Sequence, residues 1–439
     1  MRETAMPEVP VAPDAKTPEQ PKKVAFYKGS RNVADLNANG DALGLVRKDV
    51  ADVINSKNLA FLIGSGASSS RGATGQELGI PTMQPMAAGF LSATDGPHFI
   101  SVEDREALKS SLGLDLEDDL YKSNIEALME VLLGYQFTLG KSSLQNSSDS
   151  LKVVDRVIEN ATGYILEVCL RGAFATGDDT VLRTYEKFYR RIVQRDRALP
   201  RPWIFTTNYD LFSETAMDRL GIPYINGFQG SIERRFNPAV FRYALSEQLD
   251  IANRKWSSVD SLVYFAKLHG SVAWESRDDG LFPVVETHPE LIDKQRLLIY
   301  PTPAKQNASF ASPYSDMFRE FQTRVARDQS ALVTLGYGFG DEHVNNIIFQ
   351  ALTIPTFRLV AFVDPNANDM IQKLRALDDP RIWLIGTEDT NADWKGHYFA
   401  NFVEEFLATE GEDPSNLAIQ RVVDQLINRA AQAPASPDE

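Results

Sequence analysis

Seven short apolar segments, each running into polar or glycine-rich residues, constrain the fold of this chain most strongly. They are LAFLI (59–63), WIFTT (203–207), LVYFAKL (262–268), RLLIY (296–300), ALVTL (331–335), RLVAFV (358–363) and RIWLI (381–385). Most are apolar almost throughout, as parallel strands covered on both faces are. Amphipathic helical segments lie between several of them, for instance at 342–352 and 368–377. This alternation predicts an α/β fold, a doubly wound (Rossmann-like) parallel sheet.

One long region interrupts the alternation. Residues from about 101 to 200 are mainly helical in pattern and contain no convincing strand, so we expect a large helical insertion after the first βα unit. Within it, Ser123 and Glu126 have the S-x-x-E spacing of a capping box, which predicts a helix beginning at Ser123. A second, weaker insertion is expected at about 226–258.

The two ends of the sequence differ in composition from its middle. Residues 1–24 and 430–439 are rich in Pro, Ala and charged residues and are predicted to be disordered. Residues 25–400 are predicted to form the main domain, followed by C-terminal helices at 401–429. The amphipathic segment 416–427 fits either packing on its own domain or an oligomer contact.

Composition limits the location and the partners. No apolar stretch is long enough to span a membrane and the N-terminal segment has no secretory h-region, so a cytoplasmic protein is expected. The net charge of −15 argues against broad tracking of nucleic acid. The arginine-rich stretch 190–201 fits a solvated or subunit-contacting face or, as an open alternative, a local contact with nucleic acid.

The single cysteine, Cys169, excludes internal disulfides and paired CxxC zinc ligands. Because it lies in an apolar helical segment, we expect a buried, inert thiol rather than a nucleophile.

The first predicted strand runs directly into the loop GSGASSS (64–70). Glycines allow close approach of a ligand to the backbone, and N–H and hydroxyl groups can bind phosphate oxygens. The loop matches neither a Walker motif nor a full dinucleotide fingerprint. A tight turn without a ligand remains an equal alternative for Gly64, Ser65, Gly66, Ala67 and Ser68.

The second predicted strand ends in TTNYD (206–210), four polar groups within five positions. At the carboxyl end of a parallel strand, Thr206, Asn208 and Asp210 would face the crevice in which such folds bind ligands. The alternative is that Thr207 or Asn208 caps the next helix. One residue is enough for a cap, so the pattern favours a binding or catalytic role.

Three further strand ends carry candidate groups. His269 follows a strand and precedes a glycine, which suits a general base near neutral pH, although a lone histidine is more often structural. Gly336, Tyr337 and Gly338 open the loop GYGFGD (336–341), which suits ribose or phosphate, with Asp341 expected as a helix N-cap. Asp364 in VDPN fits a contact to an adenosine end or simple turn chemistry.

The order of these motifs resembles that of the sirtuin family. A sirtuin carries a glycine-rich loop after its first strand, then TQN-x-D, then His-Gly, then a further glycine-rich loop. Here GSGAS (64–68), TTNYD (206–210), LHGS (268–271) and GYGFGD (336–341) stand in those places. The resemblance covers roughly residues 45–390.

The sequence also departs from sirtuin deacylases. The zinc cysteines are absent, Thr207 replaces the glutamine of TQN, and GIPTMQP (79–85) replaces a GIPD-Phe-Arg segment. The chain is more similar to the prokaryotic sirtuin-like branch found in antiviral defence, whose members hydrolyse NAD. Its length resembles that of the stand-alone type that pairs with a HerA-like hexameric ATPase.

This resemblance implies NAD as substrate, no zinc, a homo-oligomer and a HerA-like ATPase or DNA-translocase partner. It implies NAD hydrolysis at the nicotinamide–ribose bond, with phosphates held by residues 64–68, Asn208 orienting the ribose or the water, and His269 as base. Asp210 would bind the carboxamide or steady the developing cation. Two alternatives stay open: a sensor or scaffold that binds NAD or ADP-ribose without cleaving it, and an NAD-dependent protein deacylase.

Overall fold

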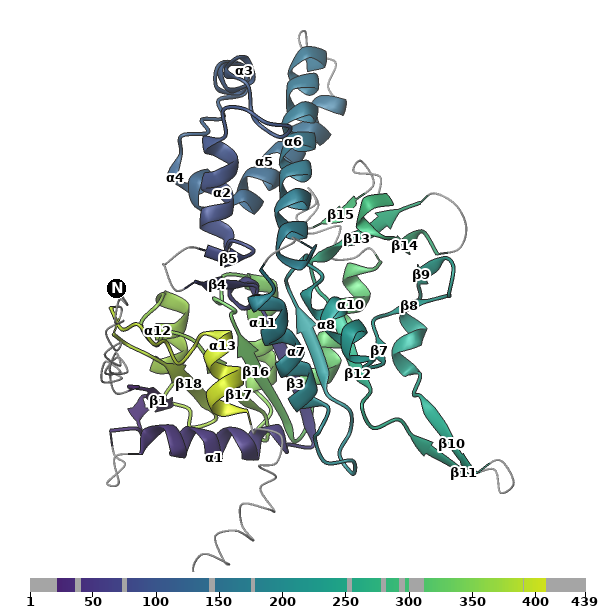
Figure 1. Cartoon of the computed structure of the whole chain (residues 1–439). Coiled ribbons are helices and arrows are strands. Elements are labelled where there is room, and N and C mark those ends of the chain that lie inside the picture. Colours follow the sequence, from purple (N-terminus) through teal and green to yellow (C-terminus); the bar gives the residue numbers. More distant parts are fainter. Residues whose placement is uncertain are drawn as a thin grey trace, which may run out of the picture.

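The computed structural model describes residues 22–35, 41–72, 77–141, 147–174, 178–250, 255–277, 282–291, 297–299, 312–389 and 391–407. Its centre is a nine-stranded sheet of order β2-β1-β18-β17-β16-β3-β6-β12-β7 (Figure 1). In chain order the strands are β1 (Ala25–Lys28), β2 (Arg31–Asn32), β3 (Asn58–Ile63), β6 (Trp203–Thr206), β7 (Tyr224–Ile225), β12 (Val263–Lys267), β16 (Ser330–Leu335), β17 (Arg358–Phe362) and β18 (Ile382–Gly386). All neighbours from β18 to β7 are parallel. The predicted α/β fold is confirmed.

One predicted strand lies elsewhere. The segment 296–300 was expected in the parallel sheet, but β15 (Leu297–Ile299) pairs antiparallel with β13 (Gly270–Ser276). These strands belong to a separate sheet of order β15-β13-β14-β9-β8, with β14 (Val284–Glu286), β9 (Arg234–Phe236) and β8 (Phe228–Gln229). An apolar run shows that a strand is buried, but it does not specify its partner, so the prediction was wrong on this point.

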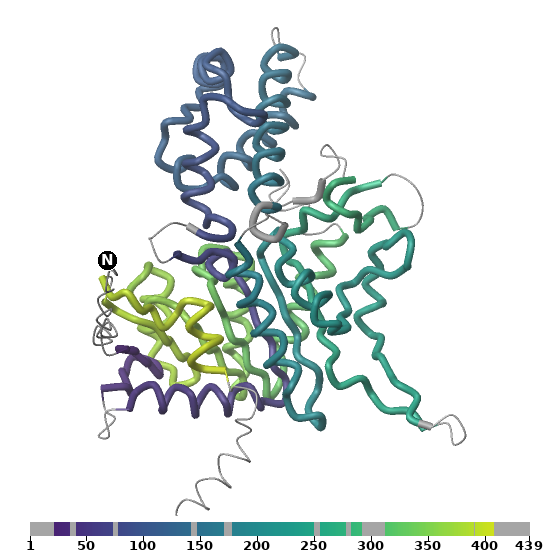
Figure 2. Tube along the Cα trace, viewed as in Figure 1, coloured from purple at the N-terminus to yellow at the C-terminus, as the bar shows by residue number. Residues whose placement is uncertain are grey.

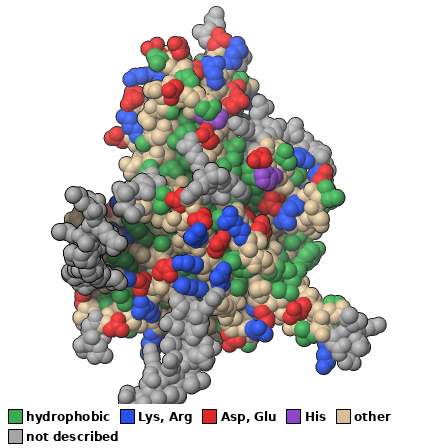
Figure 3. Space-filling view, in the orientation of Figure 1, with side chains coloured by type: hydrophobic (Ala, Val, Ile, Leu, Met, Phe, Trp, Pro, Cys, Tyr) green, Lys and Arg blue, Asp and Glu red, His purple; other side chains and the backbone are tan. Residues whose placement is uncertain are grey.

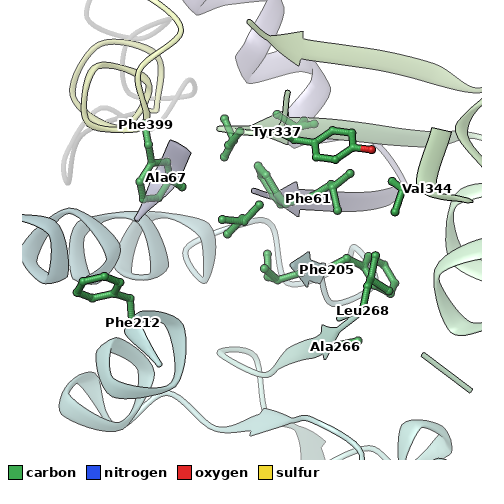
Figure 4. Packing of buried hydrophobic residues seen from close by; sticks show 14 of the residues in the cluster. Phe61, Ala67, Phe205, Phe212, Ala266, Leu268, Tyr337, Val344 and Phe399 are labelled. Atoms are coloured by element: carbon green, nitrogen blue, oxygen red, sulfur yellow. The ribbon is translucent and has the colours of Figure 1, made fainter. Parts of the chain in front are cut away.

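Helices cover both faces of the large sheet. Phe205 of β6 is paired in register with Leu62 of β3, so Phe61 and Phe205 point to opposite faces. Phe61 packs edge-on against Phe188 of α7 (Thr180–Ile192), with ring centroids 5.2 Å apart. Phe205 packs against Phe321 of α10 (Tyr314–Val325) at 4.9 Å. Figure 4 shows the same two-sided packing of apolar side chains around β3 and β6.

Further helices and two short hairpins belong to the described structure outside the helical module treated below. They are α1 (Ala42–Ile54), α8 (Phe212–Leu220), α11 (Glu342–Leu352), α12 (Asp369–Ala376), α13 (Phe399–Asn401), and two short hairpins, β4 (Ser69–Arg71) with β5 (Glu77–Gly79) and β10 (Ser246–Asp250) with β11 (Lys255–Ser258). None of the described helices is both long and apolar enough to cross a membrane.

A helical module stands above the carboxyl ends of the strands (Figure 1). It consists of α2 (Met83–Ser92), α3 (Val102–Leu112), α4 (Asp119–Ser123), α5 (Ile125–Lys141) and α6 (Ser147–Phe174). The insertion was expected at 101–200, but the module already begins at α2, and α7 lies against the sheet rather than in the module. Residues 180–192 are helical, as expected for 101–200, but a helical pattern does not indicate which layer the helix joins.

Two segments far apart in the sequence lie side by side at one edge of the sheet (Figure 2). Strand β1 pairs antiparallel with β18. Lys22 forms an ion pair with Glu405 at 2.6 Å, and Val24 is buried. The folded domain therefore starts before residue 25, whereas residues 1–21 and 408–439, including the predicted helix 416–427, lie outside the described part.

The arginine-rich stretch 190–201 makes contacts within the chain. Arg195 is buried and donates to the carbonyl of Ile54 at 2.7 Å, among other carbonyls. Arg191 contacts the carbonyl of Val403, and Arg201 contacts Asp260. Basic and acidic side chains lie interspersed on the face shown in Figure 3. Arg191, Arg195 and Arg201 therefore have partners within the chain.

The loops after β3 and β16 touch at the point where the sheet switches direction. The chain runs from β3 through β6 to β12 on one side, then returns to β16 on the other side of β3. A methyl group on Gly64 would lie 2.6 Å from the carbonyl oxygen of Gly336. One on Gly336, which has φ +62°, would lie 2.3 Å from the nitrogen of Ala67. The glycines are thus required by contact between the two loops.

Gly336→Ala tests this contact against a matched control, Gly113→Ala. Gly113 has φ +68° but open space around its α-carbon, so both variants bear the left-handed backbone cost of roughly 1–2 kcal/mol. Only Gly336→Ala adds overlap with the opposite loop, which typically costs about 1–3 kcal/mol. In urea unfolding, Gly336→Ala should therefore be the less stable protein. Equal losses in the two variants would show that the loops do not constrain each other.

Candidate active site

A cavity of about 570 Å³ lies at the carboxyl ends of β3, β6, β12 and β16, beneath the helical module. This volume is within the range of small-molecule sites. Its walls come from the loops after these strands and from α2, α5 and α6; the polar groups lining it are Ser65, Ser68, Asn124, Glu126, Glu130, Thr207, Asn208, Tyr209, Asp210, His269, Tyr337, Asp341, Glu342 and His343.

The structure places the predicted residues in two groups. Ser65, Ser68, Asn208, Asp210, His269, Gly336, Tyr337 and Gly338 line the cavity. Gly64, Gly66, Ala67 and Thr206 are not among the lining residues; Gly64 and Gly66 bond to the end of β16 and the loop after it, and the Thr206 hydroxyl bonds to Ile63 of β3. Asp364 is not among the lining residues; its carboxylate accepts a hydrogen bond from the Asn366 N–H at 2.9 Å. Turn chemistry, the alternative for VDPN, accounts for this aspartate.

The glycine-rich loop after β3 uses most of its own N–H groups. Gly64 donates to Leu335, Gly66 to Gly336, Ala67 to Gly64 and Ser68 to Ser65, at 2.9–3.1 Å. These donors are not available to phosphate oxygens in this conformation, in contrast to the expected cradle. Ser65 lines the cavity, and its N–H makes no backbone hydrogen bond among the described residues.

Ser68 is the centre of a buried network. Its hydroxyl donates to Asp210 Oδ2 at 2.7 Å and accepts from Asn208 Nδ2 at 2.9 Å. The Tyr185 hydroxyl lies 3.0 Å away and supplies its proton, since the single Ser68 proton is already committed to the carboxylate. Burial and then the charge of Asp210 raise the pKa of Tyr185 well above its ordinary value, which keeps this donor protonated.

The network fixes the orientation of the Asn208 amide. Besides Ser68, Nδ2 donates to the carbonyl oxygen of Gly64 at 3.0 Å. A carbonyl can only accept, so this end of the amide must be the NH₂ group. The other end, Oδ1, is buried and has no hydrogen-bond partner among the described residues. A buried acceptor without a partner costs free energy, so Asn208 Oδ1 is ready to bind a ligand hydroxyl or a water.

Asp210 forms two hydrogen bonds within the chain, and its role toward the carboxamide or the developing cation remains a prediction. Both carboxylate oxygens are already used: Oδ2 accepts from Ser68, and Oδ1 accepts from the Phe212 N–H at 3.1 Å at the start of α8. Leu211 is the N-cap residue of this helix and makes no side-chain cap bond, so neither Thr207 nor Asn208 caps it; Asp210, one residue earlier, accepts from the first N–H of the helix. With both oxygens engaged, Asp210 positions Ser68 and the TTNYD loop.

A buried ion pair supports the same loop from below. Lys267 donates to the backbone carbonyl of Asp210 and lies 3.1 Å from the carboxylate of Glu214. Burial raises the pKa of Glu214 to about 7, although Lys267 opposes this shift. Cys169 lines the cavity nearby; burial, and then Asp210, raise the pKa of its thiol, as expected for an inert cysteine.

His269 is paired with Asp341, a contact that the sequence did not indicate. Nε2 of the buried His269 lies 2.8 Å from Asp341 Oδ2. The other oxygen of Asp341 accepts from the Val344 N–H at 3.0 Å, which confirms the predicted N-cap of α11. The Asp341 carboxylate therefore lies beside Nε2, where it can stabilise the ring when the ring carries a positive charge.

The helical module contributes carboxylates that sequence reasoning missed. Tyr209 donates from its hydroxyl to Glu126 Oε1 at 2.6 Å, which ties the module to the TTNYD loop. Glu126 was assigned to a capping box with Ser123, but Asn124 caps α5 by accepting from the N–H groups of Glu126 and Ala127. Ser123 instead ends α4 and bonds back to Asp119. The capping-box prediction was therefore wrong: α5 is capped one residue later than predicted, by Asn124 instead of Ser123.

The cavity is strongly acidic. Five carboxylates line it, from Glu126, Glu130, Asp210, Asp341 and Glu342, whereas no Lys or Arg lines it within the described part of the chain. Negative charge in a partly enclosed site favours a cationic ligand group or a positive charge that develops during a reaction.

The pair His269–Asp341 predicts a pH dependence of stability. Burial raises the pKa of Asp341, but His269, the Val344 N–H and the charge of His343 together lower it to about 2. A carboxylate with a lowered folded-state pKa contributes stability that is present above its unfolded value and lost as the pH falls through the folded value.

Asp341→Asn keeps an N-cap residue and removes the carboxylate. One pKa unit corresponds to about 1.4 kcal/mol, so the free energy of unfolding of wild type should exceed that of the variant by roughly 2 kcal/mol at neutral pH. This difference should shrink between about pH 4 and pH 2, as measured by urea unfolding across that range. A difference that stays constant with pH would mean that Asp341 acts only as a cap.

Comparison with known proteins points to one family. The family model of the SIR2-like domain matches residues 202–382, from the start of β6 to β18, and so includes Asn208, His269 and the loop 336–341. No match was found among curated proteins. SIR2-like domains bind NAD and are often NAD-utilising enzymes. The match supports a sirtuin-like family for this chain and, broadly, NAD-related chemistry.

Proposed function

We propose that this protein is an NAD⁺ hydrolase that cleaves the nicotinamide–ribose bond to give nicotinamide and ADP-ribose. The single observation that carries the proposal is the buried Oδ1 of Asn208, which has no partner among the described residues. It lies in an acidic cavity at the switch point of the sheet, within the part of the chain that matches the SIR2-like domain. Open α/β sheets bind nucleotides at this position.

The acidic wall suits the charge changes of this reaction. NAD⁺ brings a cationic nicotinamide ring, and breaking the C–N bond transfers the positive charge to the ribosyl group. Carboxylates such as Glu126 and Glu130 stabilise that charge throughout, and the buried setting strengthens the effect. Negative charge also disfavours a pyrophosphate, so the phosphates belong near Ser65 and away from these glutamates.

Asn208 and His269 would act on the hydroxyl groups. Asn208 Oδ1 accepts a hydrogen bond from a ribose hydroxyl or from the attacking water. As water adds its oxygen to the ribosyl carbon, it loses a proton, and His269 Nδ1 accepts that proton. Asp341, whose Oδ2 lies 2.8 Å from Nε2, stabilises the imidazolium that results.

Two other functions make different predictions. A sensor that only binds NAD or ADP-ribose would hold NAD without releasing nicotinamide. A deacylase would consume one NAD for each acyl group removed from a peptide. Thr207, which replaces the sirtuin glutamine and lines the cavity, favours hydrolysis over deacylation.

We also propose a biological setting, which rests on motif resemblance. NAD depletion would serve antiphage defence by abortive infection, in a homo-oligomer paired with a HerA-like ATPase. The assay is therefore best run on the protein alone and together with that ATPase.

Asn208→Ala and His269→Ala should each lower nicotinamide release from NAD by at least about 100-fold, the usual size of a general-base contribution. Asn366→Ala and His288→Ala change the same residue types at exposed positions outside the cavity and should retain activity. Chromatography of nicotinamide and ADP-ribose measures the rates.

Wild-type rates in both cavity variants would contradict the proposed roles. Tight NAD binding by wild type with no product, alone and with the ATPase, would favour the sensor. NAD consumption that depends on an acylated peptide would favour the deacylase.

A further inference from the structure

A second pocket lies at the opposite edge of the large sheet from the proposed NAD site. It has a volume of about 310 Å³ and is formed at the amino ends of β3, β6 and β12. Strand β6 spans both places, because Trp203 lies at its start and the TTNYD loop follows its end.

This pocket is rich in arginine. Arg201, Arg242, Arg324 and Arg327 line it, and no Asp or Glu lines it within the described part of the chain. The charged residues of this lining are all basic, whereas the acidic cavity has no Lys or Arg in its described lining. A cluster of basic residues is notable in a chain with a net charge of −15. Like charges held around one concave surface repel each other, and a bound anion relieves that repulsion.

Two of the four arginines are fixed by partners. Arg201 donates to the backbone carbonyl of Asp260 at 2.6 Å and to its carboxylate at 3.1 Å. Arg324 forms an ion pair with Glu320 at 3.1 Å. Their side chains are only 13% and 26% exposed, so these guanidinium groups are held in place before any ligand binds.

The other two arginines carry the excess charge. Arg242 and Arg327 are exposed, and neither has a carboxylate partner among the described residues. A guanidinium group presents planar, paired N–H donors that match phosphate oxygens.

The lining of the pocket includes two stacked aromatic rings. The rings of Trp203 and Tyr264 are stacked, with centroids 4.7 Å apart and an interplanar angle of 6°. The guanidinium of Arg324 lies 4.2 Å from the Trp203 ring centroid. A site that combines fixed aromatic rings with arginines at its rim suits a small ligand with a phosphate group and an apolar part.

We infer that this pocket binds a small phosphate-bearing ligand, of the size of a mononucleotide or smaller. The volume of 310 Å³ is at the low end of small-molecule sites, too small for a dinucleotide. Four arginines converge on one concavity rather than forming a stripe, so the arrangement does not suit the backbone of a nucleic acid. This site is independent of the proposed hydrolase activity.

The test is calorimetric titration of the full-length chain with inorganic phosphate, pyrophosphate and AMP at constant ionic strength. Glutamate serves as the carboxylate control. The structure predicts saturable binding of at least one phosphate compound and none of glutamate. Tighter binding of AMP than of phosphate would identify a nucleotide as the source, and equal affinity would identify the free anion.

The double variant Arg242→Gln/Arg327→Gln should weaken this binding by about 10-fold or more, because hydrogen bonds to charged groups are lost. The matched control is Arg183→Gln/Arg319→Gln, which removes the same charge from side chains that are 69% and 67% exposed and lie outside the pocket. The control should bind within about twofold of wild type, because distant exposed charges are screened. Absence of saturable binding, or an equal loss in both double variants, would overturn the inference.

Discussion

The contact between the loops after β3 and β16 is the constraint on which the site depends. These strands are parallel neighbours at the switch point, and the Gly66 N–H donates to the Gly336 carbonyl at 3.0 Å. No side chain fits between the backbones. The contact fixes the loop that ends in Ser68, and Ser68 in turn orients Asn208 and Asp210.

The single hydroxyl proton of Ser68 determines the direction of the hydrogen bonds around it. Ser68 has one proton, which goes to Asp210, so Asn208 and Tyr185 must both donate to its oxygen. Asn208 is therefore held with its NH₂ group inward. Its Oδ1 is buried and has no hydrogen-bond partner among the described residues, and a ligand can supply one.

Charge is divided between the two edges of the sheet. The carboxyl edge carries a cavity with five lining carboxylates, and the amino edge carries a pocket with four lining arginines. We propose a different ligand for each charge pattern: a cationic group that reacts at one edge, and a phosphate at the other. Net charge alone, at −15, conveys neither pattern.

Much of the fold and part of the site could be predicted from sequence because their signals are local. Apolar runs identified β3, β6, β12, β16, β17 and β18, and polar residues after them indicated which loops meet at one edge. Contacts between distant residues could not be predicted in this way. The pairing of His269 with Asp341, separated by 72 positions, and of Tyr209 with Glu126 depends on how the layers pack. For the same reason, the glycines suggested a phosphate cradle, whereas their near neighbours are each other's backbones.

The most direct measurement is a crystal structure of wild type bound to a non-hydrolysable analogue of NAD. A crystal of the Asn208→Ala protein soaked with NAD serves as the comparison. The account predicts that in wild type the nicotinamide ribose lies in the acidic cavity, with a hydroxyl or a water within hydrogen-bond distance of Asn208 Oδ1 and with His269 facing it. A dinucleotide bound elsewhere, or bound with its nicotinamide ribose away from Asn208 and His269, would contradict the account.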